Sequence, residues 1–408
     1  MSSIIPVGPY HPALHEPLLI KLYVEGEYVV DADVKFGHVH RGLEWLGERR
    51  TWIQVPYLAE RICGICGDVH RRTYIAAVEK LLDIEPPPRA QYIRVIMLEL
   101  ERIHSHLLII AALFHAMGFD AWFMQIMAIR EKIMDLCELI SGNRKHYAMS
   151  VIGGVRRDIP DELKPKILRV IQEVRDYTRK VIIPVMESDK TYLARTRGIS
   201  VIPYDIALKY SLAGPTLRGS GVYSDIRYDE PYEVYPEVEW YVVTHTDGDN
   251  WARMYVRAVE TLVSCDIIED CLRKMPSGDI IHPKAKPWLR VPPRVPEGEV
   301  MARSEAPRGE VAHYIRSTGG DRPDRWRVRA PSYANFAGVK PLLVGTHIAD
   351  VPISYTSIDP CLSCTNRFEI VDVKTGKVKV MTELELRMLS RKYTKCLKDG
   401  LNKKVFTI

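Results

Sequence analysis

The sequence of 408 residues lacks the long apolar run that marks a membrane-spanning chain. A spanning helix needs about 18 or more apolar residues in succession. The nearest candidate, residues 107–119, contains His115 and ends just before Asp120. The N-terminus also lacks a charged leader followed by an apolar core, so no secretory signal is predicted. We therefore expect the chain to stay in the cytoplasm and to reach a membrane only through partner subunits.

An excess of charge of one sign is missing as well. The chain has 57 basic and 52 acidic side chains, well mixed along its length, which leave a net charge of +5. This balance predicts no binding to nucleic acid. With 46% hydrophobic and 27% charged residues, the composition is typical of a folded globular protein and excludes a disordered or disulfide-dense chain.

Hydrophobic periodicity predicts a helix bundle in the middle of the chain, and β-structure near the N-terminus. Residues 18–36 predict a hairpin with a turn at Gly26. Helices are predicted from Pro88 to about Gly118, over 120–141 with Gly142 as the stop, from 161 into the 180s where Pro184 should kink or end the helix, and over 249–275. Residues 198–236 and 276–307 are predicted to be ordered loops wrapped on the bundle. The expected fold class is α+β, with a central bundle of long helices and small peripheral hairpins or sheets, in one large domain.

Four of the eight cysteines form two CxxC pairs, Cys63 with Cys66 and Cys361 with Cys364. Each pair can direct two thiolates to one point, so the two pairs together predict a tetrathiolate site. A structural zinc site usually has its pairs about 15–20 residues apart, whereas these pairs lie near opposite ends of the chain. Soft thiolates suit zinc, iron–sulfur centres or nickel, and spacing alone does not choose among them. The remaining cysteines are predicted to be core or surface residues: Cys137, Cys265, Cys271 and Cys396.

The residues around the two pairs resemble a known family. Residues 60–70 (ERICGICGDVH) resemble the N-terminal nickel-binding motif of the [NiFe]-hydrogenase large subunit, and residues 359–367 (DPCLSCTNR) resemble its C-terminal counterpart. Residues 305–309 (EAPRG) match the arginine loop of that family. The three motifs occur in the family's order, which makes the resemblance specific.

Further motifs resemble the branch of this family that is related to respiratory complex I. They are residues 8–14 (GPYHPAL), 40–44 (HRGLE) and 214–221 (GPTLRGSG). The large subunit of this branch is similar to the quinone-site subunit of complex I. True complex I subunits have lost the cysteine pairs, whereas this chain keeps all four cysteines. It therefore resembles the catalytic subunit of a membrane-bound, energy-converting [NiFe] hydrogenase.

The resemblance implies a nickel–iron centre and assigns its ligands. Cys63 and Cys361 would be terminal ligands of nickel, whereas Cys66 and Cys364 would bridge nickel to an iron that also carries carbon monoxide and cyanide. Cys361 would take the proton when dihydrogen is cleaved, or Arg308 would assist. A guanidinium is a poor base, so a salt bridge from Arg308 to a nearby carboxylate is the alternative.

Three more residues receive roles from the resemblance, each beside a plainer alternative. Glu16 would relay protons, since burial would let its protonation alternate near neutral pH, or it is an exposed glutamate beside a turn proline. His70 would donate a hydrogen bond to a bridging cysteine, or it is an ordinary core histidine. Glu44 would hold a second, harder ion such as Mg²⁺, or it forms a salt bridge with Arg41 or Arg49.

The implied reaction needs partners, because no further cysteine cluster is available for a chain of [4Fe–4S] centres. The resemblance implies a small iron–sulfur subunit, reduced ferredoxin as electron donor for H2 evolution, and membrane subunits that translocate ions. The chain would then be peripheral, on the cytoplasmic side of the membrane. Alternatives are a nickel-free relative that reduces sulfane sulfur or quinone, and a noncatalytic scaffold with a zinc tetrathiolate.

The resemblance also divides the chain near its C-terminus. Residues 1–367 form the expected hydrogenase-like domain, and residues 368–408 form an extension. In many relatives a protease cuts three residues beyond the final cysteine, a position that Arg367 occupies here. The extension itself is predicted to hold a hairpin over 368–380 and a helix over 383–397.

Overall fold

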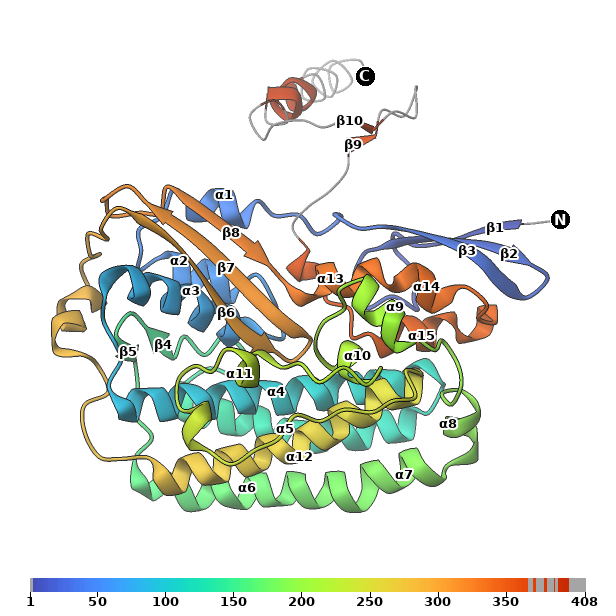
Figure 1. Ribbon diagram of the computed structural model, residues 1–408, viewed down its shortest axis with the longest axis horizontal. Coiled ribbons are helices and arrows are strands. Elements are labelled where there is room, and N and C mark those ends of the chain that lie inside the picture. Colours follow the sequence, from blue (N-terminus) through green and yellow to red (C-terminus); the bar gives the residue numbers. More distant parts are fainter. Residues whose placement is uncertain (1–2, 366–369, 372–377, 380–384, 386–387, 396–408) are drawn as a thin grey trace, which may run out of the picture. The chain divides into compact units, whose positions relative to one another are not determined.

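The computed structural model describes residues 3–365 and, near the C-terminus, residues 370–371, 378–379, 385 and 388–395. The chain divides into two compact units, Met1–Asn366 and Arg367–Ile408. The first unit combines long helices with small antiparallel sheets, so the predicted α+β fold class is confirmed (Figure 1). None of the helices described is both long and apolar enough to cross a membrane.

The long helices of the first unit form the predicted bundle. They are α4 (Pro88–Ala116), α5 (Asp120–Ser141), α6 (Lys164–Tyr177) and α12 (Asn250–Lys274). Gly142 ends α5 in the left-handed region, at a φ of 83°, which glycine adopts without steric cost. The side chain of Asp249 caps α12 by accepting a hydrogen bond from the backbone N–H of Ala252. Helix α4 packs against both α5 and α12 (Figure 1).

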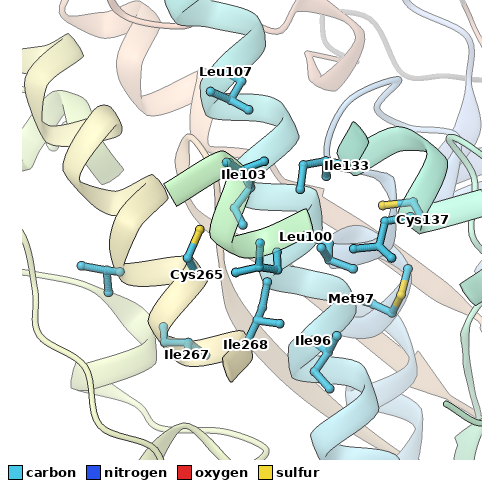
Figure 2. Packing of buried hydrophobic residues seen from close by; sticks show 14 of the residues in the cluster. Ile96, Met97, Leu100, Ile103, Leu107, Ile133, Cys137, Cys265, Ile267 and Ile268 are labelled. Atoms are coloured by element: carbon cyan, nitrogen blue, oxygen red, sulfur yellow. The ribbon is translucent and has the colours of Figure 1, made fainter. Parts of the chain in front are cut away.

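One apolar face of α4 lies at the centre of this bundle. Figure 2 shows Ile96, Leu100 and Ile103 of α4 pointing toward side chains of α5 and α12, and all three are fully buried. Cys137 and Cys265 lie in the same core, and Cys271 belongs to it as well. These three cysteines are therefore core residues, as predicted. Cys396 lies outside the described residues.

The helix predicted from residue 161 into the 180s is divided. A 3-10 turn, η1 (Asp161–Leu163), leads into α6, and a π-helical segment, η2 (Thr178–Ile182), joins α6 to α7 (Ile183–Ser188). Pro184 lies in the first turn of α7, directly after the π segment. Since proline has no N–H and its ring clashes with the preceding turn, the wider π turn accommodates it without breaking the helical path.

Two three-stranded antiparallel sheets flank the helices. The first has the order β1 (Ser3–Val7), β2 (Leu19–Glu25), β3 (Tyr28–Lys35), and the β2–β3 pair confirms the predicted hairpin. The second has the order β6 (Gly298–Ala306), β7 (Gly309–Ser317), β8 (Arg325–Arg329). A smaller ladder joins β4 (Ser150–Val151) to β5 (Gly154–Val155).

Strand β6 contradicts the prediction that residues 276–307 form only loops. Its inward side chains include Ala302, Ser304 and Ala306, which are small, and three of the four residues that alternate with them are charged: Glu299, Arg303 and Glu305. The sequence therefore lacks the run of β-branched and aromatic residues by which a strand is usually recognised. The strand forms because β7 pairs with it along its whole length.

Three helices follow the first sheet along the chain: α1 (Leu43–Gly47), α2 (Val55–Glu60) and α3 (Gly67–Leu82). Helix α3 packs beneath β6 and β7 (Figure 1). The predicted loop 198–236 consists of ordered chain with short helical turns. The remaining short helices are α8 (Lys190–Ala194), α9 (Tyr204–Lys209), α10 (Gly214–Arg218), α11 (Ile226–Asp229), η3 (Tyr235–Glu237), η4 (Pro283–Leu289), α13 (Pro331–Ala337), α14 (Val339–Leu343), η5 (Ile348–Asp350), α15 (Val351–Ser357) and η6 (Leu362–Cys364).

Buried ion pairs join the bundle to the segment that contains Arg227. The carboxylate of Glu99 on α4 accepts hydrogen bonds from Arg102 and Arg227, and also from the Ser264 hydroxyl of α12 at 2.6 Å. Burial alone would raise the pKa of Glu99, but the two guanidinium groups outweigh it and lower the pKa to about 2. Because one such partner cannot be removed without leaving an uncompensated buried charge, these pairs hold the segments in place.

In the second unit, β9 (Ile370–Val371) pairs antiparallel with β10 (Val378–Lys379), and residues 388–395 are helical. These elements fall within the predicted hairpin and the predicted helix. The remaining residues of both predictions lie outside the described residues, as does Arg367.

Candidate metal centre

The two CxxC pairs, from opposite ends of the chain, meet in the interior of the first unit. Cys63 follows α2, and Cys66 is the N-cap of α3. Cys361 is the N-cap of η6, and Cys364 is the last residue of that turn. The Sγ atoms of Cys63 and Cys361 lie 3.4 Å apart, those of Cys361 and Cys364 lie 3.1 Å apart, and all four side chains are buried.

The surroundings of Cys63 favour a thiolate. Its Sγ accepts the backbone N–H groups of Ile65 at 3.2 Å and Cys66 at 3.0 Å, at the N-terminus of α3. Burial opposes ionisation, but hydrogen bonds from the other three cysteines and the charge of Arg308 outweigh it, so the pKa of Cys63 lies well below its usual value. A low pKa is the property that a metal-binding thiol needs.

The thiols form a donor set that fits a metal. Two groups, Cys63–Cys361–Cys364 and Cys66–His70–Cys364, each have their ligand atoms within 4.8 Å of one another. Four thiolates so close together repel one another, so a multivalent cation is needed to keep them all ionised. Their softness suits nickel, zinc or iron–sulfur chemistry, and excludes a site built for Mg²⁺ or Ca²⁺.

His70 lies beside this donor set. It is a buried residue of α3, and its Nε2 atom is 3.7 Å from Sγ of Cys364. Burial lowers the pKa of His70 to about 4, so its imidazole is neutral at ordinary pH. The structure thus brings His70 into contact with the second cysteine pair, whereas its sequence spacing relates it only to the first.

Arg308 occupies the tip of the two-residue turn between β6 and β7, where Ala306 pairs with Gly309. Its guanidinium lies 2.6 Å from the carboxylate of Asp359, and its Nε donates to the Asp359 carbonyl at 2.8 Å. Burial disfavours its charge, but the electrostatic attraction of Asp359 and of the cysteines Cys361, Cys66 and Cys63 outweighs burial and raises the pKa of Arg308 well above its usual value. Arg308 is therefore a fixed cation next to the thiols, and it also makes the salt bridge that was the alternative.

Glu16 contacts the turn that carries the second cysteine pair. This residue is half-buried, and its carboxylate accepts the backbone N–H of Ser363 at 3.1 Å. It also accepts the N–H of Leu362 and the hydroxyl of Ser363. The structure thus gives Glu16 an anchoring contact between Cys361 and Cys364, in place of the exposed position considered from sequence.

Glu44 is engaged elsewhere. Its carboxylate accepts hydrogen bonds from the Arg327 guanidinium at 2.9 Å and from the backbone N–H of Val328 at 2.8 Å, both on β8. It pairs with a cation, as the alternative expected, but that partner is Arg327 of a distant strand. Among the residues that the structure describes, neither group able to hold a metal ion includes Glu44.

Other residues near the thiols were not predicted from the sequence. The Ser332 hydroxyl accepts the backbone N–H of Cys361 at 3.2 Å, and the Ser105 hydroxyl lies 3.4 Å from the Arg308 guanidinium. Asp359 stands two residues before Cys361 and could have been noted as a partner for Arg308. Ser332 and Ser105 belong to no motif and come from helices distant in the sequence, so no sequence pattern predicts their contacts with the site.

Comparison with known proteins relates both halves of the site to described families. Residues 116–367 match the family described as "Respiratory-chain NADH dehydrogenase, 49 Kd subunit", and residues 41–122 match "Nickel-dependent hydrogenase". The first cysteine pair falls within the hydrogenase match, and the second falls within the 49 kDa match.

Similar proteins cover nearly the whole chain. The membrane-bound hydrogenase subunit alpha of Pyrococcus furiosus is 43% identical over 404 residues, which covers 96% of this chain and 93% of the relative. The carbon monoxide-induced hydrogenase of Rhodospirillum rubrum is 41% identical, covering 89% and 99%. In the solved structure of the membrane-bound sulfane sulfur reductase, an archaeal respiratory membrane complex, one chain superposes with a TM-score of 0.84 at 34% identity, covering 90% and 98%.

These relatives confirm the resemblance that the motifs indicated. Relatives that are 43% and 41% identical over most of their own length establish a shared family. The first of them and the sulfane sulfur reductase are named as membrane-bound. The chain belongs to the family that joins the 49 kDa subunit of respiratory-chain NADH dehydrogenase with the large subunits of complex I-related, membrane-bound hydrogenases.

Proposed function

We propose that this chain is the catalytic subunit of a membrane-bound [NiFe] hydrogenase that reduces protons to H2. The observation that carries the proposal is the convergence of four buried thiols next to the buried cation Arg308. Complex I subunits without cysteine pairs have no use for such a donor set, whereas a nickel–iron centre requires it. The names of two relatives, a membrane-bound hydrogenase and a carbon monoxide-induced hydrogenase, support the same activity.

The four thiols of Cys63, Cys66, Cys361 and Cys364 would hold the centre, as the resemblance to the family implies. When bound, this centre, with carbon monoxide and cyanide on the iron, supplies the chemistry that makes and cleaves dihydrogen heterolytically. The chain itself excludes water by burying all four cysteines, and it lowers the pKa of Cys63 through its neighbours.

Proton transfer would use residues at the second cysteine pair. Arg308 stays protonated because of its salt bridge with Asp359, so it acts as a cation and not as a base. In H2 evolution the thiol of Cys361 would therefore deliver the proton, and in the reverse reaction its thiolate would accept it. Glu16 would pass protons inward from solvent toward Cys361, because it is half-buried and touches the turn between Cys361 and Cys364.

Electrons would come from reduced ferredoxin through a small iron–sulfur subunit, and membrane subunits would use the released energy to translocate ions. The positions of the other cysteines support this part of the proposal. The described cysteines outside the two pairs lie in the bundle core, so they do not form a site for an iron–sulfur cluster. The complex would carry this chain as a peripheral subunit on the cytoplasmic side.

A second candidate is reduction of sulfane sulfur. The solved sulfane sulfur reductase complex contains a chain that covers 90% of this one at a TM-score of 0.84. In that case the fold and partners would be retained without nickel. A third candidate, a noncatalytic scaffold, would carry zinc at the four thiols.

Metal analysis of the purified complex separates the three candidates. We expect nickel and iron beyond the content of the partner clusters. Zinc alone would identify the scaffold, and neither metal at this site would identify the nickel-free reductase.

Cys361→Ser provides the matching functional test. A hydroxyl is a much harder ligand than a thiolate, so the variant should lose nickel and H2 evolution while the complex still assembles. Cys137→Ser is the control, because this cysteine lies in the bundle core and should tolerate the change with nickel retained. Normal H2 evolution by Cys361→Ser would refute the nickel assignment.

A further inference from the structure

A buried line of aromatic side chains extends from His70 into the second sheet. His313 lies on β7 and Trp326 on β8, and both are fully buried, like His70. In the strand register His313 faces Val328, two residues beyond Trp326, so His313 and Trp326 are diagonal neighbours on the inward face of the sheet. That face covers α3, the helix that carries His70.

Hydrogen bonds connect these side chains in one direction. The indole Nε1 of Trp326 lies 3.2 Å from Nδ1 of His313. Nε2 of His313 lies 3.1 Å from Nδ1 of His70, and Nε2 of His70 lies 3.7 Å from Sγ of Cys364. The line therefore begins at an indole and ends at a thiol of the candidate metal centre.

The chemistry of the indole determines every proton position along this line. An indole N–H can only donate, so Nδ1 of His313 must accept and its ring proton must be on Nε2. That N–H then donates to Nδ1 of His70, which places the His70 proton on Nε2 as well. Only this pair of tautomers uses all the contacts, and it directs the His70 N–H to the Cys364 sulfur.

The position of Trp326 is itself constrained by close packing. A Cβ added at Gly47 of α1 would lie 2.2 Å from an indole carbon of Trp326, so only glycine leaves room for this ring. On another side the ring of Tyr74 contacts the indole edge-on, at 5.6 Å between centroids. The donor of the line therefore has a fixed direction.

We propose that Trp326 and His313 are positioning residues that fix the tautomer of His70 and thereby direct an N–H···S hydrogen bond to Cys364. The inference deepens the proposed function and rests on it. A hydrogen-bond donor to a metal-bound thiolate withdraws electron density from the sulfur. Substitution of residues that hydrogen-bond to metal ligands usually lowers activity or metal affinity about 10- to 100-fold.

Nitrogen-15 NMR of the complete complex, labelled in its histidine rings, tests the proton positions directly. Protonated and bare ring nitrogens give well separated signals, and we expect both His70 and His313 to carry their proton on Nε2. In Trp326→Phe, which keeps an aromatic ring but removes the donor, both histidines should shift toward the Nδ1-protonated form. The control Tyr74→Phe removes only a hydroxyl without a hydrogen-bond partner and should change neither residue.

Two substitutions of His313 test the same inference without disturbing the indole. Gln can accept from Trp326 with its oxygen and donate to His70 with its nitrogen, so His313→Gln should preserve the His70 tautomer. His313→Leu can do neither and should lose it. Unchanged His70 signals in both Trp326→Phe and His313→Leu would overturn the inference.

The loaded enzyme gives a second readout in the infrared bands of the iron's diatomic ligands. Loss of the N–H···S donor leaves the sulfur more electron-rich, so the carbon monoxide band should move to lower wavenumber in Trp326→Phe and His313→Leu. Turnover should fall about 10- to 100-fold in the same variants. A complex without nickel would refute the proposed function, whereas the NMR signals would still decide the inference about the histidines.

Discussion

The carboxylate of Glu16 combines two functions that substitution can separate. It anchors the turn between Cys361 and Cys364, and in the proposed mechanism it also relays protons. In Glu16→Gln the amide oxygen can still accept a backbone N–H, so nickel should be retained, but the amide cannot relay a proton. We expect turnover to fall about 100-fold or more, as for the loss of a positioned acid–base group.

The companion variant Glu16→Ala removes both functions and should lower the nickel content as well as H2 evolution. Nickel analysis and H2 evolution of the two variants, measured side by side, check this separation. Full turnover in Glu16→Gln would mean that protons reach the site by another route, of which His15 and His11 are the nearest candidates in the sequence.

At the scale of elements, the β6–β7 turn and helix α10 approach so closely that each needs a glycine. Gly214 has a φ of +62°, and a Cβ there would lie 2.5 Å from the carbonyl of Arg308. Gly214→Ala should therefore displace the turn that holds Arg308, lower the melting temperature and abolish most H2 evolution. Thermal unfolding and activity of the purified complex measure both effects.

Gly26→Ala is the matched control for that experiment. Gly26 has the same φ of +62°, but no atom lies within 4 Å of its added Cβ. This variant carries only the backbone strain, about 1–2 kcal/mol, and should keep full activity. If the two variants lost stability and activity equally, the close approach would not be what requires Gly214.

At the scale of the whole molecule, the four-cysteine site can form only after the C-terminal part of the first unit has folded against the rest. Cys361 and Cys364 lie near its C-terminal boundary. In the proposed function, nickel would have to reach them before the chain closes over the thiols. We expect maturation to include cleavage between Arg367 and Phe368, which releases residues 368–408. Intact mass measurement of this subunit from active, nickel-loaded complex decides the matter. A mass near 46.7 kDa, that of the full chain, would show that the extension is permanent.

Much of the fold was predictable because local chemistry decides it. Gly142 and Asp249 end and begin helices through their own backbone and side-chain preferences, and the spacing of apolar residues along α4 indicates its buried face. Strand β6 was missed, because its inward residues are small and its formation depends on pairing with β7. The π segment before Pro184 was missed for a similar reason, since only packing selects it over a break.

By itself the sequence determined the family and indicated the candidate donors of the site, because two CxxC pairs and their neighbours are local patterns. Only the tertiary structure decided how those donors are oriented and charged. The contact of Glu16 with Ser363, the pairing of Arg308 with Asp359 and the line from Trp326 to Cys364 all join segments that are distant along the chain. Glu99 likewise depends on Arg227 of a distant segment, in addition to Arg102 of its own helix, because its burial would be unfavourable without these cations. Hydrogen bonds and ion pairs in a buried site depend on distances of a few ångströms, and no spacing along the sequence specifies such distances.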